Sequence, residues 1–354
     1  MKRVFLFLIL ALIIVAIQSE AASDWTPEKL QKYVERKIKR NDKVLRISFK
    51  PIGDEGAKFL AEFSPLQNLT TLILYGVGIG DEGARSLAHS TVLANLTHLS
   101  LENNLVSDEG VEFLADSKTL SKLKTLNLYR NKIGNIGAIT ISESHSLTDL
   151  AELILSFNQI ADEGAIRLTS STHLKNLSRL EMAGNPLGKI GEEACAKFDH
   201  KQTFKKLYHS GALANLERHF IGDLGLFALL ETPFIEDFEE LNLNENQITD
   251  AGVAALANSP KLSGLTSLKL ADNLIKNPGA QALANSPNLI NLKEQILDYN
   301  FIGDEGAKAF ALTNHLSRLE KLSLEENQIG PIGAEALSNS KSLKNLKYPI
   351  FGFH

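Results

Sequence analysis

The sequence predicts an elongated α/β repeat protein in which each repeat contributes one short strand and one helix. The chain has 354 residues, longer than the size at which one compact core usually stops growing. Residues 99–110 recur, with the same residue types in the same order, at 126–137 and again at 153–164. A fixed period of this length predicts a solenoid, whose repeats bury their apolar faces against one another.

An Asn marks the period, which is 27 residues. The two apolar residues five and three positions before this Asn alternate with polar ones, as in a strand with one buried face. The Asn amide is expected to satisfy backbone groups of neighbouring repeats, forming a structural ladder. The 34 residues from Asn185 to His219, which takes the Asn position in the next repeat, exceed the period by seven. Two series carry the Asn itself: Asn104, Asn131, Asn158, Asn185, and then Asn246, Asn273, Asn300, Asn327.

Each repeat continues into a helix with a fixed start. Six residues after the Asn position, Gly occupies all eleven complete repeats, which predicts close backbone approach or a special dihedral angle. An Asp such as Asp54 or Asp81 precedes this Gly by two residues and is expected to be a helix N-cap. Ala and Leu then recur as the buried face of a helix, as in residues 279–284.

These residues resemble the ribonuclease-inhibitor-like class of leucine-rich repeat proteins, with the pattern Leu-x-x-Leu-x-Leu-x-x-Asn-x-Ile-x-x-x-Gly-Ala-x-x-Leu. The resemblance covers residues 44–354, and repeats reading Asp-Glu-Gly-Ala are closer to the bacterial members than to the Cys-rich vertebrate inhibitor. It implies an α/β horseshoe with parallel strands on the concave face and helices on the convex face. Twelve strands, counting the incomplete last repeat, would then lie side by side.

The first residues predict export. Lys2 and Arg3 precede an apolar run over 4–17, and small residues follow at Ser19 and Ala21. This order is typical of a signal peptide over residues 1–21, so we expect a secreted or periplasmic protein. The alternative is an uncleaved membrane anchor, although a helix of that run would span only about 21 Å of the ~30 Å hydrocarbon core.

The repeats, residues 44–354, are flanked by a capping helix predicted within 22–43 and are interrupted by an irregular repeat at 186–219. Residues 28–50 hold nine basic and three acidic side chains. A solvated cap face is favoured there, and a surface for an anionic membrane is the alternative. Residues 195–218 are interpreted as a degenerate repeat or as a binding loop.

The last residues begin a strand that no helix follows. Pro349 takes a position that Leu usually fills and is expected to weaken pairing at this edge. Self-association through the C-terminal edge strand is therefore an alternative to a protected end.

Known catalytic and cofactor motifs are absent from the sequence. It contains no Walker loop, nucleophile elbow, His-Glu-x-x-His or dinucleotide fingerprint, so no catalytic residue, no cofactor and no enzyme activity are expected. The spacing of Cys195, His200, His209 and His219 matches no metal site. A net charge of −5 argues against a nucleic-acid partner.

A scaffold of this type binds at strand positions that point away from the buried Leu pair. In the C-terminal half these positions hold eight acids and three bases, which favours a protein partner with a basic patch. The candidates in the N-terminal half are Tyr75, Glu102, Tyr129, Arg130 and Phe157. Those in the C-terminal half are Glu240, Asn242, Asn244, Glu245, Asp272, Glu294, Asp298, Tyr299, Glu325 and Glu326.

The sequence thus predicts an exported, non-enzymatic scaffold that binds a protein partner on its concave face. Two alternatives stay open. One is a secreted effector that regulates a host enzyme or small GTPase, which the family resemblance permits. The other is a structural protein of the cell envelope.

Overall fold

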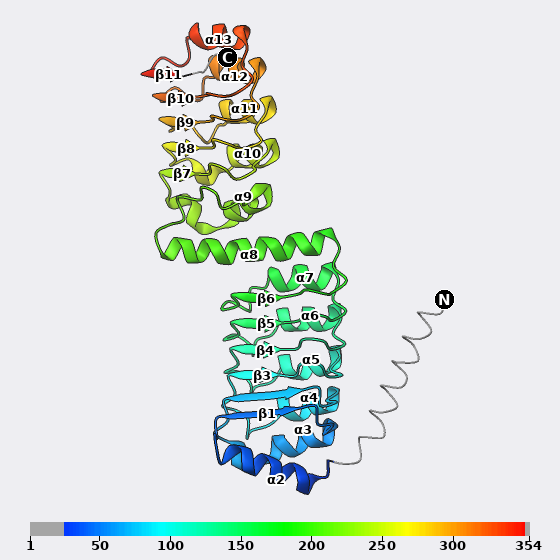
Figure 1. Cartoon of the computed structure of the whole chain (residues 1–354). Helices are drawn as coiled ribbons and strands as arrows, with labels where there is room; N and C mark the ends of the chain where they lie inside the picture. The colour runs from blue at the N-terminus through cyan, green and yellow to red at the C-terminus, as the bar shows by residue number, and fades with distance from the viewer. Residues whose placement is uncertain (1–24, 351–354) are drawn as a thin grey trace, which may run out of the picture. The chain divides into compact units, whose positions relative to one another are not determined.

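The computed structural model describes residues 25–350, which form two compact units (Figure 1). Unit 1 ends at Cys195 and unit 2 begins at Ala196. The predicted signal peptide and His354, the last residue, lie outside the described residues. Among those that are described, no helix is both long and apolar enough to cross a membrane.

Unit 1 contains a parallel sheet whose strands follow one another in chain order, with helices along one of its sides (Figure 1). Equivalent residues of successive repeats pair, as Leu72 with Leu99 and Leu99 with Leu126. The strands are β1 (Val44–Ser48), β2 (Thr71–Tyr75), β3 (His98–Ser100), β4 (Thr125–Asn127), β5 (Glu152–Ile154) and β6 (Arg179–Glu181). The helices are α2 (Pro27–Ile38), α3 (Gly53–Glu62), the 3-10 turn η2 (Ser64–Leu66), α4 (Asp81–Ala88), α5 (Asp108–Ala115), α6 (Asn135–Ser142) and α7 (Asp162–Thr169).

Unit 2 repeats this arrangement with a second parallel sheet, again in chain order. Helix α8 (Lys189–His209) begins in unit 1 and ends in unit 2. The strands of unit 2 are β7 (Glu240–Asn242), β8 (Ser267–Lys269), β9 (Glu294–Ile296), β10 (Lys321–Ser323) and β11 (Tyr348–Ile350). The helices after α8 are α9 (Gly222–Glu231), η3 (Pro233–Asp237), α10 (Asp250–Ala257), η4 (Pro260–Leu262), α11 (Asn277–Ala284), α12 (Asp304–Leu312) and α13 (Pro331–Ser338).

The irregular repeat accounts for the division into two sheets. Its extra residues lengthen α8 to 21 residues, where other repeats have helices of 8 to 10. The strand expected before His219 is reduced to one bridge between Asn215 and Asn242. Instead of one row of twelve strands, the described residues therefore form two separate sheets. The buried rows of Leu between strands and helices nevertheless confirm the predicted α/β solenoid.

The side chain of each ladder Asn joins two repeats. Asn104 accepts hydrogen bonds at Oδ1 from the backbone N–H of Val77 (3.2 Å) and Ile79 (3.0 Å), and Nδ2 donates to the Leu74 carbonyl at 2.7 Å. This buried amide therefore satisfies backbone groups of the preceding repeat that water does not reach. Equivalent bonds to the preceding repeat are made by Asn131, Asn158, Asn185, Asn246, Asn273, Asn300 and Asn327.

The sequence suggested that the Asp residues at the helix starts cap their own helices, but the structure shows that they do not. Asp54 lies inside the first turn of α3 and accepts hydrogen bonds at Oδ1 from the backbone N–H of Gly80 (2.7 Å) and Gly83 (3.0 Å), at the start of α4. Each Asp thus caps the helix of the following repeat, which leaves fewer of its first N–H groups unsatisfied. The same role falls to Asp81, Asp108, Asp162, Asp223, Asp250 and Asp304, and to Asn135 and Asn277.

This capping explains the recurring Gly in every repeat but the two with Gly56 and Gly225. A Cβ added to Gly83 would lie 2.5 Å from Asp54 Oδ1 and 2.8 Å from Ile79 Cγ2. Gly83 itself has no left-handed φ, so the constraint is close approach rather than a special dihedral angle. The side chains that leave no room for a Cβ at Gly83 are Asp54 of the preceding repeat and Ile79, four positions before the Gly.

A third contact between repeats caps the C-terminal ends of the helices. Ser90 Oγ donates to the carbonyl of Ala61, in the last turn of α3, at 2.5 Å, and accepts from the backbone N–H of Leu93 at 3.1 Å. The hydroxyl therefore satisfies a helix C-terminal carbonyl that has no partner within its own helix. The equivalent donors are Ser117, Ser144, Ser171, Ser286, Thr313 and Ser340.

One buried residue breaks the pattern. Gln295, in β9, occupies a position where its partners on β8 and β10 are Leu268 and Leu322. Its side chain is fully buried, and neither its amide nitrogen nor its carbonyl oxygen has a hydrogen-bond partner among the described residues. An unpaired buried amide costs about 1–3 kcal/mol.

We predict that Gln295→Leu raises the free energy of unfolding by about 1–3 kcal/mol, because the change removes two unpaired polar atoms from an apolar row. Denaturant unfolding of the full chain measures this. The matched control is Gln67→Leu at an exposed position, for which a change within about 0.5 kcal/mol is expected. A loss of stability in Gln295→Leu would contradict the assignment of Gln295 as an unsatisfied group.

Candidate functional site on the strand faces

We define the strand face of each unit as the exposed surface made by side chains six, four, two and one positions before each Asn of the ladder, or before Lys50, Val77 and His219, which take the Asn position in other repeats. The predicted residues fall into two groups on it. Tyr75, Glu102, Tyr129, Arg130 and Phe157 lie in unit 1, where the first three are half-buried and the last two are exposed. The remaining candidates, Glu240 to Glu326, lie in unit 2.

The position directly before each Asn, or before the residue that replaces it, has left-handed backbone geometry. At this position φ is 55° in Arg130, 59° in Phe157 and 55° in Tyr299. L-residues other than Gly avoid this region at a cost of roughly 1–2 kcal/mol. The position is filled by Phe49, Gly76, Asn103, Arg130, Phe157 and Gly184 in unit 1, and by Arg218, Glu245, Asp272, Tyr299 and Glu326 in unit 2.

This turn points one side chain outward and the next one, the ladder Asn, inward. The backbone N–H of Phe157 donates to the Ala183 carbonyl of the next repeat at 2.7 Å, and the N–H of Arg130 donates to the Ser156 carbonyl at 2.9 Å. These backbone bonds to the next repeat therefore hold the left-handed turn in place. This turn is hard to predict from sequence, because only Gly76 and Gly184 in this series are Gly, the residue type that adopts it without strain.

Two aromatic side chains at left-handed positions pack on the glycines of the next repeat. A Cβ on Gly184 would lie 2.7 Å from Cδ1 of Phe157, and one on Gly76 would lie 3.4 Å from Cδ1 of Phe49. Both Phe side chains remain largely in solvent, 51% exposed in Phe157 and 71% in Phe49. Glycine at these two positions thus makes room for an exposed aromatic ring.

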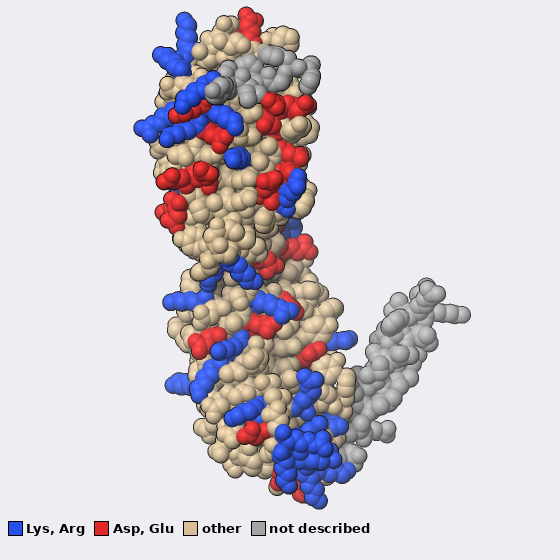
Figure 2. All heavy atoms as spheres, turned by 60° about the vertical axis from the view of Figure 1, so that its left-hand side comes forward, with Lys and Arg blue, Asp and Glu red and all other residues tan. Residues whose placement is uncertain are grey.

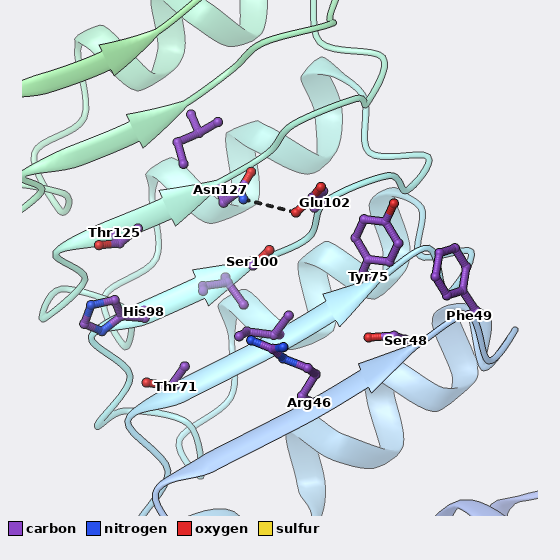
Figure 3. Close-up of a pocket in the computed structure, with 13 residues that line it drawn as sticks. Arg46, Ser48, Phe49, Thr71, Tyr75, His98, Ser100, Glu102, Thr125 and Asn127 are labelled. Carbon is purple, nitrogen blue, oxygen red and sulfur yellow. Dashed lines mark hydrogen bonds between the residues drawn. The ribbon is translucent and has the colours of Figure 1, made fainter.

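The strand face of unit 1 encloses a hollow of about 480 Å³ over β1 to β5. Phe49 and Tyr75 stand at one end, with their ring centroids 4.7 Å apart, and Asn127 Nδ2 donates to Glu102 Oε2 at 3.4 Å (Figure 3). Two polar side chains, Glu102 and Asn127, therefore line the hollow together with an aromatic pair. The lining residues are Arg46, Ser48, Phe49, Thr71, Ile73, Tyr75, His98, Leu99, Ser100, Glu102, Thr125, Asn127 and Ile154.

Arg46 is the cation of this hollow. It lies beside Ile73 of β2 in the parallel register and is exposed. Its guanidinium makes no hydrogen bond or ion pair with any other residue that the structure describes. Tyr75 and Glu102 were predicted here. Phe49, Ile73 and Ile154 were missed, and the signal that marks the two Ile is an apolar residue at an outward strand position.

Several predicted residues of unit 2 hold the sheet together. Asn244 Oδ1 accepts from the Ala271 backbone N–H at 2.8 Å, and Asp298 Oδ1 accepts from the Glu325 N–H at 2.9 Å. Asn242 accepts from the Asn244 N–H at 3.1 Å. These side chains accept hydrogen bonds from backbone N–H groups of their own or the next repeat. Part of their hydrogen-bonding capacity is therefore already used.

Ion pairs neutralise two more predicted carboxylates. Arg218 Nε lies 2.6 Å from Glu245 Oε2, and this hydrogen bond lowers the pKa of the Glu245 carboxyl. Burial acts to raise the pKa of Glu294, but hydrogen bonds from Lys321 (2.9 Å) and Ser267 (2.8 Å) outweigh it, so that pKa is lowered.

Exposed groups remain on the strand face of unit 2. Glu240, Asp272 and Glu326 are exposed, Glu325 is half-buried, and the Tyr299 ring is 60% exposed. The face therefore combines carboxylates with one large aromatic side chain.

Groups suited to chemistry do not gather on either face. Within the described part of the chain, no group of three or more His, Cys, Asp and Glu side chains is arranged to hold a metal ion. Burial raises the pKa of Asp199 and lowers that of its neighbour His200, but both lie on α8, away from the strands.

Comparison with known proteins identifies the family. The leucine-rich repeat model matches residues 66–88, 92–115, 119–142, 146–168, 237–257, 263–284, 290–311 and 315–338, more than half of the chain. The chain belongs to the leucine-rich repeat family, a class of protein–protein interaction scaffolds. Placement in the ribonuclease-inhibitor-like class remains a prediction. No curated protein matches the sequence significantly.

Similar solved structures include two internalins of Listeria monocytogenes strain 4b F2365. Internalin C2 is 22% identical with a TM-score of 0.23, over 74% of this chain and 83% of that one. Internalin F is 20% identical with a TM-score of 0.27, over 96% of this chain and 94% of that one. Neither likeness is close enough to carry information about binding or location.

We predict that Arg130→Gly does not destabilise the fold and raises the free energy of unfolding by up to about 1 kcal/mol, since Gly adopts the left-handed turn without strain. Arg130→Val should lower it by about 1–2 kcal/mol, because a β-branched residue suits this turn least. Thermal unfolding of both variants checks the sign. If Gly and Val destabilised the protein equally, the Arg130 side chain itself would be stabilising the turn.

Proposed function

We propose that this protein is an exported, non-enzymatic scaffold that binds a protein partner through its strand faces. Membership of the leucine-rich repeat family supports the scaffold role. Export is supported by the signal-like residues 1–21 in the sequence.

The observation that carries the proposal is the type of side chain presented at the left-handed turns. Phe49, Arg130 and Phe157 occupy positions where Gly would be less strained, and all three are exposed. Aromatic residues and Arg provide the largest contributions at protein interfaces, and rings fixed by packing lose little entropy on binding.

The dimensions of unit 1 suit a protein partner. Six strands spaced by ~4.8 Å give a surface roughly 24 Å across, on which the Phe49–Tyr75 pair borders the hollow. Arg46, which has no ion pair among the described residues, favours a partner that places a carboxylate in this hollow beside an apolar group. On unit 2, the exposed carboxylates around Tyr299 favour a basic patch on the partner.

We predict that replacing Phe49 and Tyr75 together with Ala abolishes capture of the partner, because this change removes the aromatic border of the hollow. The measurement is affinity capture from the extracellular and envelope fractions, followed by titration of the captured protein. The matched control replaces Phe59 and Phe63, an aromatic pair on the helix side with ring centroids 5.0 Å apart.

Loss of capture by both double variants, or by neither, would contradict a strand-face site, provided that circular dichroism shows both to be folded. Recovery of the protein from the cytoplasm with residues 1–21 intact would contradict the proposed export.

A further inference from the structure

The cap of unit 1 carries a continuous basic surface. Helix α2 buries Leu30 and Val34 against the first repeat. Its other side exposes cations three or four residues apart, a spacing that places them on one side of a helix. Lys29, Lys32 and Arg36 of the helix, together with Lys39, Arg40 and Lys43 after its end at Ile38, form a surface that we name the basic stripe; all six are exposed. Figure 2 shows Lys and Arg gathered at this end of the unit.

Four cations of the stripe have no hydrogen-bond or ion-pair partner among the described residues: Lys32, Lys39, Arg40 and Lys43. Of the nearby carboxylates, Glu35 accepts from Gln31 at 2.9 Å and Asp42 accepts from Asn68 at 3.0 Å, while Glu28 interacts electrostatically with Lys32. The stripe thus keeps its positive charge in a chain whose net charge is −5.

An aromatic cluster borders the stripe. Trp25 and Tyr33 meet edge to face with ring centroids 5.5 Å apart. Lys50 Nζ lies 5.0 Å from the Trp25 ring centroid, while Lys37 Nζ and Arg36 Cζ lie 5.3 Å and 5.7 Å from that of Tyr33. Trp and Tyr next to Lys and Arg are the residues that anchor proteins at the headgroup level of a bilayer.

We propose that the basic stripe docks on a membrane surface rich in anionic phospholipids. The predicted signal peptide would bring this end of the chain to a membrane during export, because Trp25 follows the apolar run 4–17 by eight residues, at most about 29 Å of extended chain. A lipid surface fits better than a nucleic acid, since the basic stripe covers one cap only while the chain as a whole is acidic. The inference is independent of the strand faces.

Trp25 is the only Trp of the chain, so its fluorescence reports on this surface directly. The experiment adds vesicles of phosphatidylcholine, or of phosphatidylcholine and phosphatidylglycerol in equal parts, to the protein as recovered from cells. We expect a blue shift of Trp25 emission and co-sedimentation with the anionic vesicles, both weakened by added salt.

The test variant combines Lys32→Glu, Arg36→Glu and Lys39→Glu. The matched control combines Lys118→Glu, Lys124→Glu and Lys132→Glu, which are exposed elsewhere on unit 1 and change the net charge equally. The test variant should lose about a hundredfold in partition to anionic vesicles, and the control should bind as the wild type does.

Three results would overturn the proposal. One is equal partition of the wild type to both kinds of vesicle. A second is an equal loss of binding in the two triple variants, which would assign the effect to total charge. A third is tighter binding to a random-sequence DNA duplex than to the anionic vesicles, which would assign the stripe to nucleic acid.

Discussion

The structure depends on hydrogen bonds from side chains of one repeat to the backbone of the next or the preceding one. A single repeat has a three- to five-residue strand and a short helix, and neither satisfies its own end groups. Asn104 reaches back to the turn of the preceding repeat, Asp54 reaches forward to the start of α4, and Ser90 reaches back to the end of α3. Since an unpaired buried N–H or C=O costs about 1–3 kcal/mol, these contacts decide whether the repeats can stack at all.

The same contacts shape the candidate binding surface. Because the Asn amide is held inward, the residue before it must turn through the left-handed region and point outward. The residues whose backbone is strained by the stacking of repeats are therefore the residues whose side chains point outward on the strand face. In unit 1 these include two exposed Phe rings and Arg130, which lie at defined places on a rigid sheet. Binding on such a surface loses less entropy than binding by a mobile loop.

Much of the fold was predictable because it is periodic. The Asn spacing and the alternating Leu pair identified the strands, and the break after Asn185 located the irregular repeat. The role of Asp54 was assigned wrongly because sequence places an N-cap next to its own helix, whereas this carboxylate lies closer to the following one. The separation into two sheets depends on how α8 packs. The presence of seven extra residues in the sequence does not predict that packing.

The candidate site was predictable only in part. Outward positions such as Tyr75 and Glu102 follow from strand alternation. The left-handed turn was hidden, because most repeats fill it with residues other than Gly, and Phe49 and Ile73 were missed because apolar residues were assigned to the core. The roles of Asn244 and Asp298 in bracing the unit 2 sheet depend on neighbours one repeat away.

Replacing Asp54 tests most directly whether bonds between repeats hold the stack. Asn takes the same role at positions 135 and 277, so Asp54→Asn should keep the two N–H donors of α4 bound, whereas Asp54→Ala should release them. Hydrogen exchange at the Gly80 and Gly83 amides is the measurement, with the Gly134 amide, bound by Asp108, as the internal reference. The account predicts lost protection at Gly80 and Gly83 and about 1–3 kcal/mol lower stability in Asp54→Ala alone. Equal protection in Asp54→Ala and Asp54→Asn would contradict it.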